Sequence, residues 1–148
     1  MRTLVVYDSM HGNTEKVAQA VGDVIGGDTT VVHVSKVTSD HVKAVNLLIV
    51  GSPTHGGRPT PPLQGFLKSL SAPAGGARAA VFDTRLGSAW VKIFGFASNR
   101  MARELRSKGW NIVEPVEGFR VKKSEGPLLD GELQRAASWA RELSHENA

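Results

Sequence analysis

The sequence contains no cysteine, and this absence narrows the chemistry that its 148 residues can perform. Disulfides, thiolate metal sites, iron–sulfur ligation and cysteine nucleophiles are all excluded. No spacing of histidine and carboxylate residues indicates a metal site either. A redox function would therefore depend on a bound cofactor.

The sequence also lacks a long apolar run and a recognisable secretory leader. Residues 1–3 lead directly into a short apolar segment, and no segment approaches the roughly 18 apolar residues of a membrane span. We therefore expect a cytoplasmic protein that does not enter the membrane.

Acidic residues are fewer than basic ones, which gives a formal charge of +4. A surplus of this kind fits an anionic ligand, an acidic partner or simply a well-solvated surface. Because no dense basic run interleaved with aromatic residues is present, we do not expect nucleic acid as a partner.

Strand-like and helix-like patterns alternate along the chain, which predicts one α/β domain over residues 1–148. Strand-like runs occur at 4–7, 29–34, 45–50 and 78–82, with two halves of a fifth strand at 110–113 and 119–121. Helical patterns occur at 14–25, 40–44, 63–70, 98–108 and 130–143. Alternation of this kind predicts a parallel sheet with helices on both faces.

A polar loop at residues 8–14 separates the first strand from the first helix, where α/β folds bind their ligands. Ser9, Asn13 and Thr14 can donate hydrogen bonds to a phosphate, and Gly12 allows close backbone approach. The alternative is that these side chains only cap the helix. Other phosphate-binding patterns are missing: the chain has no Walker motif and no G-x-G-x-x-G after this strand.

The same segment resembles the signature of the flavodoxin family. The matching positions are Val5, Val6, Tyr7, Ser9, Gly12, Thr14, Ala18 and Val21. The length is similar to that of a short-chain flavodoxin. The resemblance implies a three-layer, doubly wound α/β sandwich whose five parallel strands have the order 2-1-3-4-5. It also implies bound FMN, with the phosphate held by residues Ser9, Met10, His11, Gly12, Asn13 and Thr14.

Two later loops fall where the family contacts the flavin ring. The first contributes Pro53, Thr54, His55, Gly56 and Gly57. The resemblance implies that His55 packs on the ring and that a Gly56 or Gly57 peptide reorients on reduction. The second loop follows the fourth strand and contributes Asp83, Thr84, Arg85, Leu86 and Gly87. Trp90 either stacks on the ring or belongs, with Phe94, to the core or surface.

The second of these loops departs from the family, because electron-transferring flavodoxins usually carry an acidic, tyrosine-bearing stretch there. Cations near the expected ring, namely His55, Arg58, Arg85 and Lys92, would favour an anionic reduced flavin. They predict a reduction potential less negative than that of an acidic flavodoxin.

The resemblance favours an FMN-binding electron-transfer protein that serves one or more redox protein partners. The alternative is a small FMN-dependent oxidoreductase, either a quinone reductase or a protoporphyrinogen-oxidase-like enzyme, since one fold supports several chemistries. Typical flavodoxins are acidic and dock on basic reductases, so the basic charge here indicates an acidic partner instead. We expect a monomer or weak dimer. A flavodoxin-like binding module that has lost FMN is a further alternative.

Overall fold

The computed structural model describes residues 1–87 and 96–145. The strands are β1 (Arg2–Tyr7), β2 (Asp28–His33), β3 (Leu47–Pro53), β4 (Arg78–Leu86), β5 (Asn111–Ile112) and β6 (Glu117–Val121). The helices are α1 (Asn13–Ile25), α2 (Ser39–Val42), α3 (Pro61–Ser69), α5 (Ala97–Ser107) and α6 (Glu132–His145), with a 3-10 turn η1 (Val34–Lys36). These helices begin and end within one or two residues of the predicted ranges.

A parallel sheet forms the centre of the fold, with the strand order β2-β1-β3-β4-β5. Val5 of β1 lies opposite Val31 of β2 on one side and Ile49 of β3 on the other. This confirms the predicted doubly wound sheet and its order. Because the strands run in one direction, the segments that follow β1, β3 and β4 meet at one edge of the sheet.

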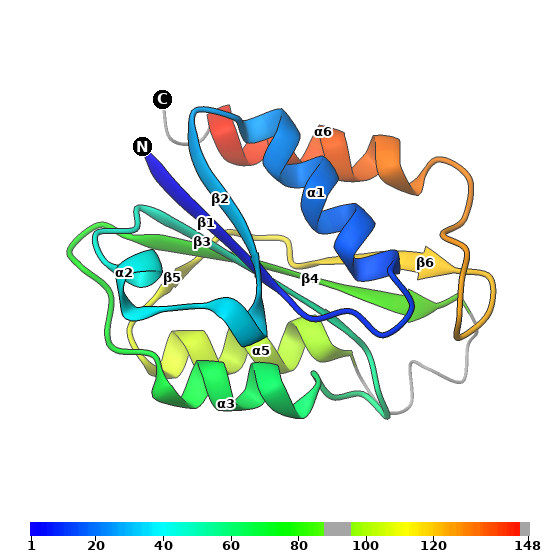
Figure 1. Ribbon diagram of the computed structural model, residues 1–148, viewed down its shortest axis with the longest axis horizontal. Coiled ribbons are helices and arrows are strands. Elements are labelled where there is room, and N and C mark those ends of the chain that lie inside the picture. The colour runs from blue at the N-terminus through cyan, green and yellow to red at the C-terminus, as the bar shows by residue number, and fades with distance from the viewer. Residues whose placement is uncertain (88–95, 146–148) are drawn as a thin grey trace.

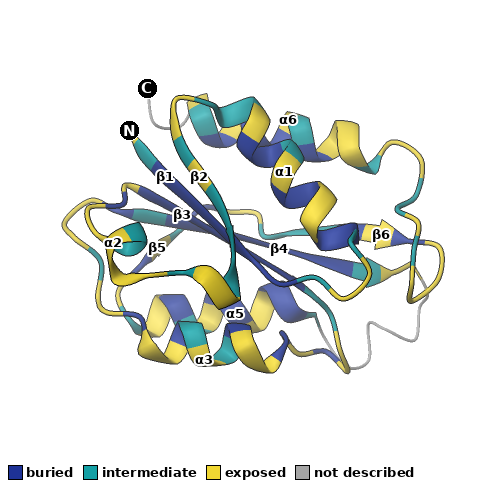
Figure 2. Cartoon of the chain, viewed as in Figure 1, coloured by how far each residue is buried: buried dark blue, intermediate teal, exposed yellow. Residues whose placement is uncertain are grey.

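Helices cover both faces of the sheet, with α1 and α6 on one face and α3 and α5 on the other (Figure 1). The burial pattern follows these layers, because buried residues gather in the strands and on the helix sides that face them (Figure 2). Under α1 and α6, the rings of Phe82, Phe119 and Trp139 meet with centroids 5.9–6.1 Å apart. The other face buries Leu48 against Leu67 and Leu105 in a second apolar cluster.

The predicted fifth strand is divided in two, as its sequence indicates. β5 pairs with the start of β4, where Arg78 lies opposite Asn111. β6 pairs with the end of β4, where Phe82 lies opposite Glu117. Pro115 lies between the two pieces and has no N–H to donate to a sheet ladder.

The prediction that β4 ends at Phe82 is wrong, because the strand continues to Leu86. β6 supplies the partner for this extension, with Leu86 opposite Val121. Residues 83–86 are therefore strand rather than the beginning of a loop. Among the described helices, none is long and apolar enough to cross a membrane.

Candidate functional site

A cleft lies where β1, β3 and β4 end, and the sequence-predicted site residues account for most of its described lining. Its volume is about 120 Å³. The lining consists of Ser9, Met10, His11, Asn13, Thr14, Pro53, Thr54, His55, Thr84, Arg85, Leu86, Val121 and Ser124. None of these side chains is acidic, so the described lining favours an anionic ligand over a cationic one.

The loop after β1 leaves a group of backbone N–H donors free. Gly12 has a φ of 88° and precedes α1 without a side-chain cap, a conformation that glycine adopts without strain. Ser9 Oγ accepts hydrogen bonds from the N–H groups of Gly12 and Glu15, at 3.0 and 3.4 Å. Within the described part of the chain, four other N–H groups of this loop and first helical turn donate to nothing: those of Met10, His11, Asn13 and Thr14.

These free donors fit a phosphate. A helix N-terminus carries the positive end of the backbone dipole, and its first N–H groups lack partners inside the helix. An anion at this place accepts several hydrogen bonds at once. The arrangement disfavours the alternative in which the loop side chains only cap α1.

A buried carboxylate holds the loop in place. Asp8 Oδ1 accepts hydrogen bonds from the Ser9 N–H at 2.8 Å and from His33 Nε2 at 3.1 Å. Its other oxygen accepts a 2.6 Å bond from the Thr60 hydroxyl, and the Thr60 N–H donates to Ser52 Oγ at 3.1 Å. Asp8 thereby ties the phosphate-side loop to β2 and to the segment after β3.

His33 and Tyr7 pack behind this carboxylate. The Ser35 N–H donates to His33 Nδ1 at 3.1 Å, which leaves the proton on Nε2, the atom that faces Asp8. The His33 and Tyr7 rings meet edge to face at 5.4 Å. Tyr7 donates to Glu15 at 2.9 Å, and burial together with this acidic neighbour raises the tyrosine pKa to about 12. The phenol is therefore protonated at neutral pH.

Two predicted phosphate donors are partly engaged with other parts of the protein. Asn13 Nδ2 donates to the Glu125 carbonyl at 3.1 Å, and one side-chain N–H remains. The Thr14 hydroxyl lies 2.8 Å from the hydroxyl of Thr84 and is buried. The segment after β6 therefore packs on the phosphate-side loop, which explains why Ser124 lines the cleft.

The loop after β3 makes a tight turn at the rim of the cleft. Backbone hydrogen bonds of 2.9 and 3.0 Å connect His55 and Arg58 in both directions. Between them Gly56 and Gly57 have φ values of 56° and 79°, and two successive positive values are the geometry in which glycine is favoured. His55 is exposed and lines the cleft, whereas the two glycines do not line it.

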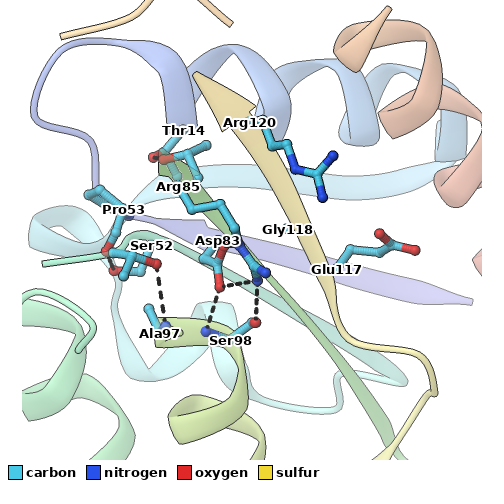
Figure 3. A network of polar contacts seen from close by, with 12 residues as sticks. Thr14, Ser52, Pro53, Asp83, Arg85, Ala97, Ser98, Glu117, Gly118 and Arg120 are labelled. Carbon is cyan, nitrogen blue, oxygen red and sulfur yellow. Dashed lines mark hydrogen bonds and ion pairs between the residues drawn. The ribbon is translucent and has the colours of Figure 1, made fainter. Parts of the chain in front are cut away.

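The two charged residues at the end of β4, Asp83 and Arg85, form an ion pair with each other. Arg85 donates two hydrogen bonds to Asp83, at 2.6 and 2.7 Å. The Ser98 N–H at the start of α5 donates to the same carboxylate at 2.9 Å, and the Ala97 N–H donates to Thr54 Oγ1 at 3.3 Å. Figure 3 shows this network, with the guanidinium directed toward Asp83 and Ser98 and away from Thr14.

This geometry changes the expectation for the third flavin loop. Asp83 is fully buried and does not line the cleft. The charge of Arg85 is offset by that carboxylate, so the expected contribution of Arg85 to a cationic ring environment is not supported. Gly12 and Gly87 are also absent from the lining, although Gly12 shapes the loop beside it. Trp90, Lys92 and Phe94 lie outside the described residues.

The sequence did not predict the residues that hold the loop after β1 in place through hydrogen bonds. Asp8, His33 and Thr60 are such residues, and Ser124 lines the cleft itself. Their positions carried a usable signal, because Asp8, His33 and Ser124 each lie at or just after the carboxyl end of a strand. In a parallel sheet that edge is where ligands bind.

Most of the chain matches a known protein family. The flavodoxin family model matches residues 5–139, and the chain belongs to the flavodoxin family. Members of this family bind flavin, typically FMN, and carry electrons. No curated protein matches the chain significantly.

Solved structures share the fold at low sequence identity. A flavodoxin from the domain Archaea is 24% identical with a TM-score of 0.81, and the match covers 99% of this chain and 98% of that one. Flavodoxin 1 from Bacillus cereus is 19% identical with a TM-score of 0.80, over 98% of each chain. Rubredoxin oxygen:oxidoreductase from Desulfovibrio gigas is 19% identical with a TM-score of 0.77, over 98% of this chain and 35% of that larger one.

Proposed function

We propose that this protein binds FMN in the cleft and carries electrons between redox protein partners. The observation that carries the proposal is the set of free backbone N–H groups at Met10, His11, Asn13 and Thr14. They lie at the N-terminus of α1, in a chain whose family binds flavin. Such a set is suited to the phosphate of a nucleotide.

The residues of the cleft have separate tasks in this proposal. FMN supplies the redox chemistry, and the protein supplies binding, orientation and local electrostatics. The free N–H groups and the Ser9 hydroxyl bind the phosphate. Asp8 keeps that loop in position through its bonds to Ser9, His33 and Thr60. His55 and the Gly56-Gly57 turn form the ring side of the site.

The described lining of the cleft supports an electron carrier over an oxidoreductase, because it offers few groups that could transfer a proton to a substrate. His11 and His55 are the only imidazoles in the described lining, and no carboxylate accompanies them to move a proton.

The test is reconstitution with FMN followed by stepwise reduction at controlled potential. Binding gives flavin absorption bands near roughly 370 and 450 nm. Two separately resolved one-electron steps support the carrier. A single two-electron step with steady NAD(P)H-dependent quinone turnover contradicts the carrier and supports an FMN-dependent oxidoreductase. No binding with excess FMN overturns the proposal and leaves a binding module that has lost its cofactor.

A further inference from the structure

Residues of α3, of α5 and of the segment before α3 line a basic groove. The two helices cover the face of the sheet opposite α1 and α6 (Figure 1). The volume of the groove is about 380 Å³. The lining residues are Arg58, Pro59, Gln64, Leu67, Lys68, Arg100, Arg103 and Glu104. Four cations therefore face this groove together with a single carboxylate.

The four cations have no partner in the described part of the chain. Arg58, Lys68, Arg100 and Arg103 are exposed, and none of their side chains makes an ion pair or hydrogen bond there. Some basic residues elsewhere are engaged; Arg135, for example, pairs with Glu117 and Glu132. The groove thus concentrates positive charge that no residue in the described part of the chain neutralises by an ion pair.

The groove begins at the candidate flavin site. Arg58 closes the turn that His55 opens, so one end of the groove adjoins the rim of the cleft. Lys68 lies in the last turn of α3, and with a rise of about 1.5 Å per helical residue the nine residues of α3 span about 13 Å. Arg100 and Arg103 share one side of α5, because residues three apart face the same way.

We propose that this groove, lined by Arg58, Lys68, Arg100 and Arg103, docks an acidic segment of the redox protein partner. The identity of the occupant as a redox protein rests on the function proposed above. Arg58 precedes α3 and Lys68 lies in its last turn, so these two cations are separated by about the length of that helix. This spread suits an extended run of carboxylates better than one small anion. Arginine binds carboxylates through two parallel hydrogen bonds. The net charge of +4 also attracts an acidic partner to the protein as a whole.

The first test uses a fluorescein-labelled hexaglutamate peptide and fluorescence polarisation, with the full chain in the presence and absence of FMN. The peptide is expected to bind in both states, and more weakly as salt rises above about 0.1 M. The Arg100→Glu/Arg103→Glu variant is expected to bind the peptide at least about tenfold more weakly. Arg100→Gln/Arg103→Gln, which removes charge without reversing it, is expected to give an intermediate loss.

The matched control is Lys36→Glu/Arg141→Glu, which makes the same change in net charge outside the groove. It should change peptide affinity by no more than about twofold. Equal losses in the two double variants would overturn the proposal, because net charge alone would then explain binding. Displacement of the peptide by equimolar tripolyphosphate would also overturn it, in favour of a phosphate site.

A second test uses an acidic plant-type [2Fe–2S] ferredoxin as the electron donor to the FMN-loaded protein. One electron passes from the reduced cluster to the oxidised flavin in each encounter. Reversal of Arg100 and Arg103 should slow this reduction about tenfold and leave reduction by dithionite unchanged. Equal rates with ferredoxin for the wild type and this variant would contradict the proposal. Failure to bind FMN would contradict only the proposed function, because peptide binding does not require the flavin.

Discussion

The loop after β1 and the end of β4 border the same cleft, but they use their polar groups in opposite ways. Among the residues that the structure describes, the N–H groups of Met10, His11, Asn13 and Thr14 in this loop have no partners. The strand end pairs Asp83 with Arg85 and with the start of α5. One region is therefore prepared for a ligand, while the other holds two elements of the fold together. Position at the edge of a sheet does not by itself distinguish the two roles.

The difference follows from burial. A carboxylate as buried as Asp83 requires charged and hydrogen-bonding partners, because an unpaired buried charge is strongly unfavourable. Arg85 and the Ser98 N–H supply them. Of the four free N–H groups after β1, those of Met10 and His11 belong to exposed residues and are accessible to water, whereas those of Asn13 and Thr14 belong to buried residues that line the cleft.

The largest loss of stability is expected from a substitution at the end of β4. Asp83→Ala leaves Arg85 and the Ser98 N–H without their acceptor, and should lower the free energy of unfolding by about 3–5 kcal/mol. Urea denaturation measures this loss. The double variant Asp83→Leu/Arg85→Met removes both charges and should lose less than the single variant. A loss below about 1 kcal/mol for Asp83→Ala would show that the pair does not hold the strand end.

A smaller loss is expected for Gly118→Ala on β6. A Cβ at this position would lie 2.1 Å from Arg85 Cζ, so the guanidinium must move away from Asp83. The expected loss in the free energy of unfolding is about 1–3 kcal/mol. Gly87→Ala is the matched control, because its Cβ would meet Arg120 Cδ at an ordinary 3.7 Å. If the two variants are equally stable to heat, the position of the Arg85 guanidinium against Asp83 does not stabilise the fold.

The opposite pattern is expected in the loop after β1, where binding should change more than stability. Ser9→Ala should weaken FMN binding about tenfold and lower the free energy of unfolding of the apo-protein by no more than about 1 kcal/mol. Calorimetric titration and urea denaturation measure the two quantities. Ser69→Ala removes a hydroxyl that bonds the Phe66 carbonyl in α3 and should leave FMN affinity unchanged. If Ser9→Ala binds FMN as tightly as the wild type, the Ser9 hydroxyl does not contribute to the site.

The ion pair between Glu132 and Arg135 is more exposed than the buried Asp83–Arg85 pair and is expected to contribute less to stability. Burial raises the pKa of Glu132, but the hydrogen bond from Arg135 and that from the Arg120 N–H outweigh this effect and leave the pKa lowered. A lowered pKa in the folded state stabilises the protein above the unfolded value of about 4.3. This stability is lost as the pH falls through the folded pKa.

The Glu132→Gln variant measures this contribution. It should be about 1 kcal/mol less stable than the wild type at pH 7, and the difference should shrink below pH of about 4. Glu142→Gln changes the same charge on the same helix, where the described residues provide no ion pair. A pH-independent difference for Glu132→Gln would contradict the account of this pair.

Local signals in the sequence predicted the alternation of strands and helices, and the resemblance to the flavodoxin family predicted the order of the strands and most of the cleft lining. Buried strands such as β1 are continuous apolar runs, and the segment from Val5 to Val21 carries the family signature. The extension of β4 to Leu86 was not predictable in this way, because it depends on β6, which is more than 30 residues distant along the chain. The engagement of Asp83 and Asp8 likewise depends on partners from other elements.

The comparison of FMN with riboflavin, by calorimetric titration of the apo-protein, tests the central claim most directly. The two ligands share the ring and the ribityl chain and differ only in the phosphate. If the free N–H groups after β1 bind that phosphate, FMN should bind at least about 100-fold more tightly than riboflavin, since hydrogen bonds to a charged group contribute about 1.5–3 kcal/mol each. Equal affinities for the two ligands, or no affinity for either, would contradict the claim.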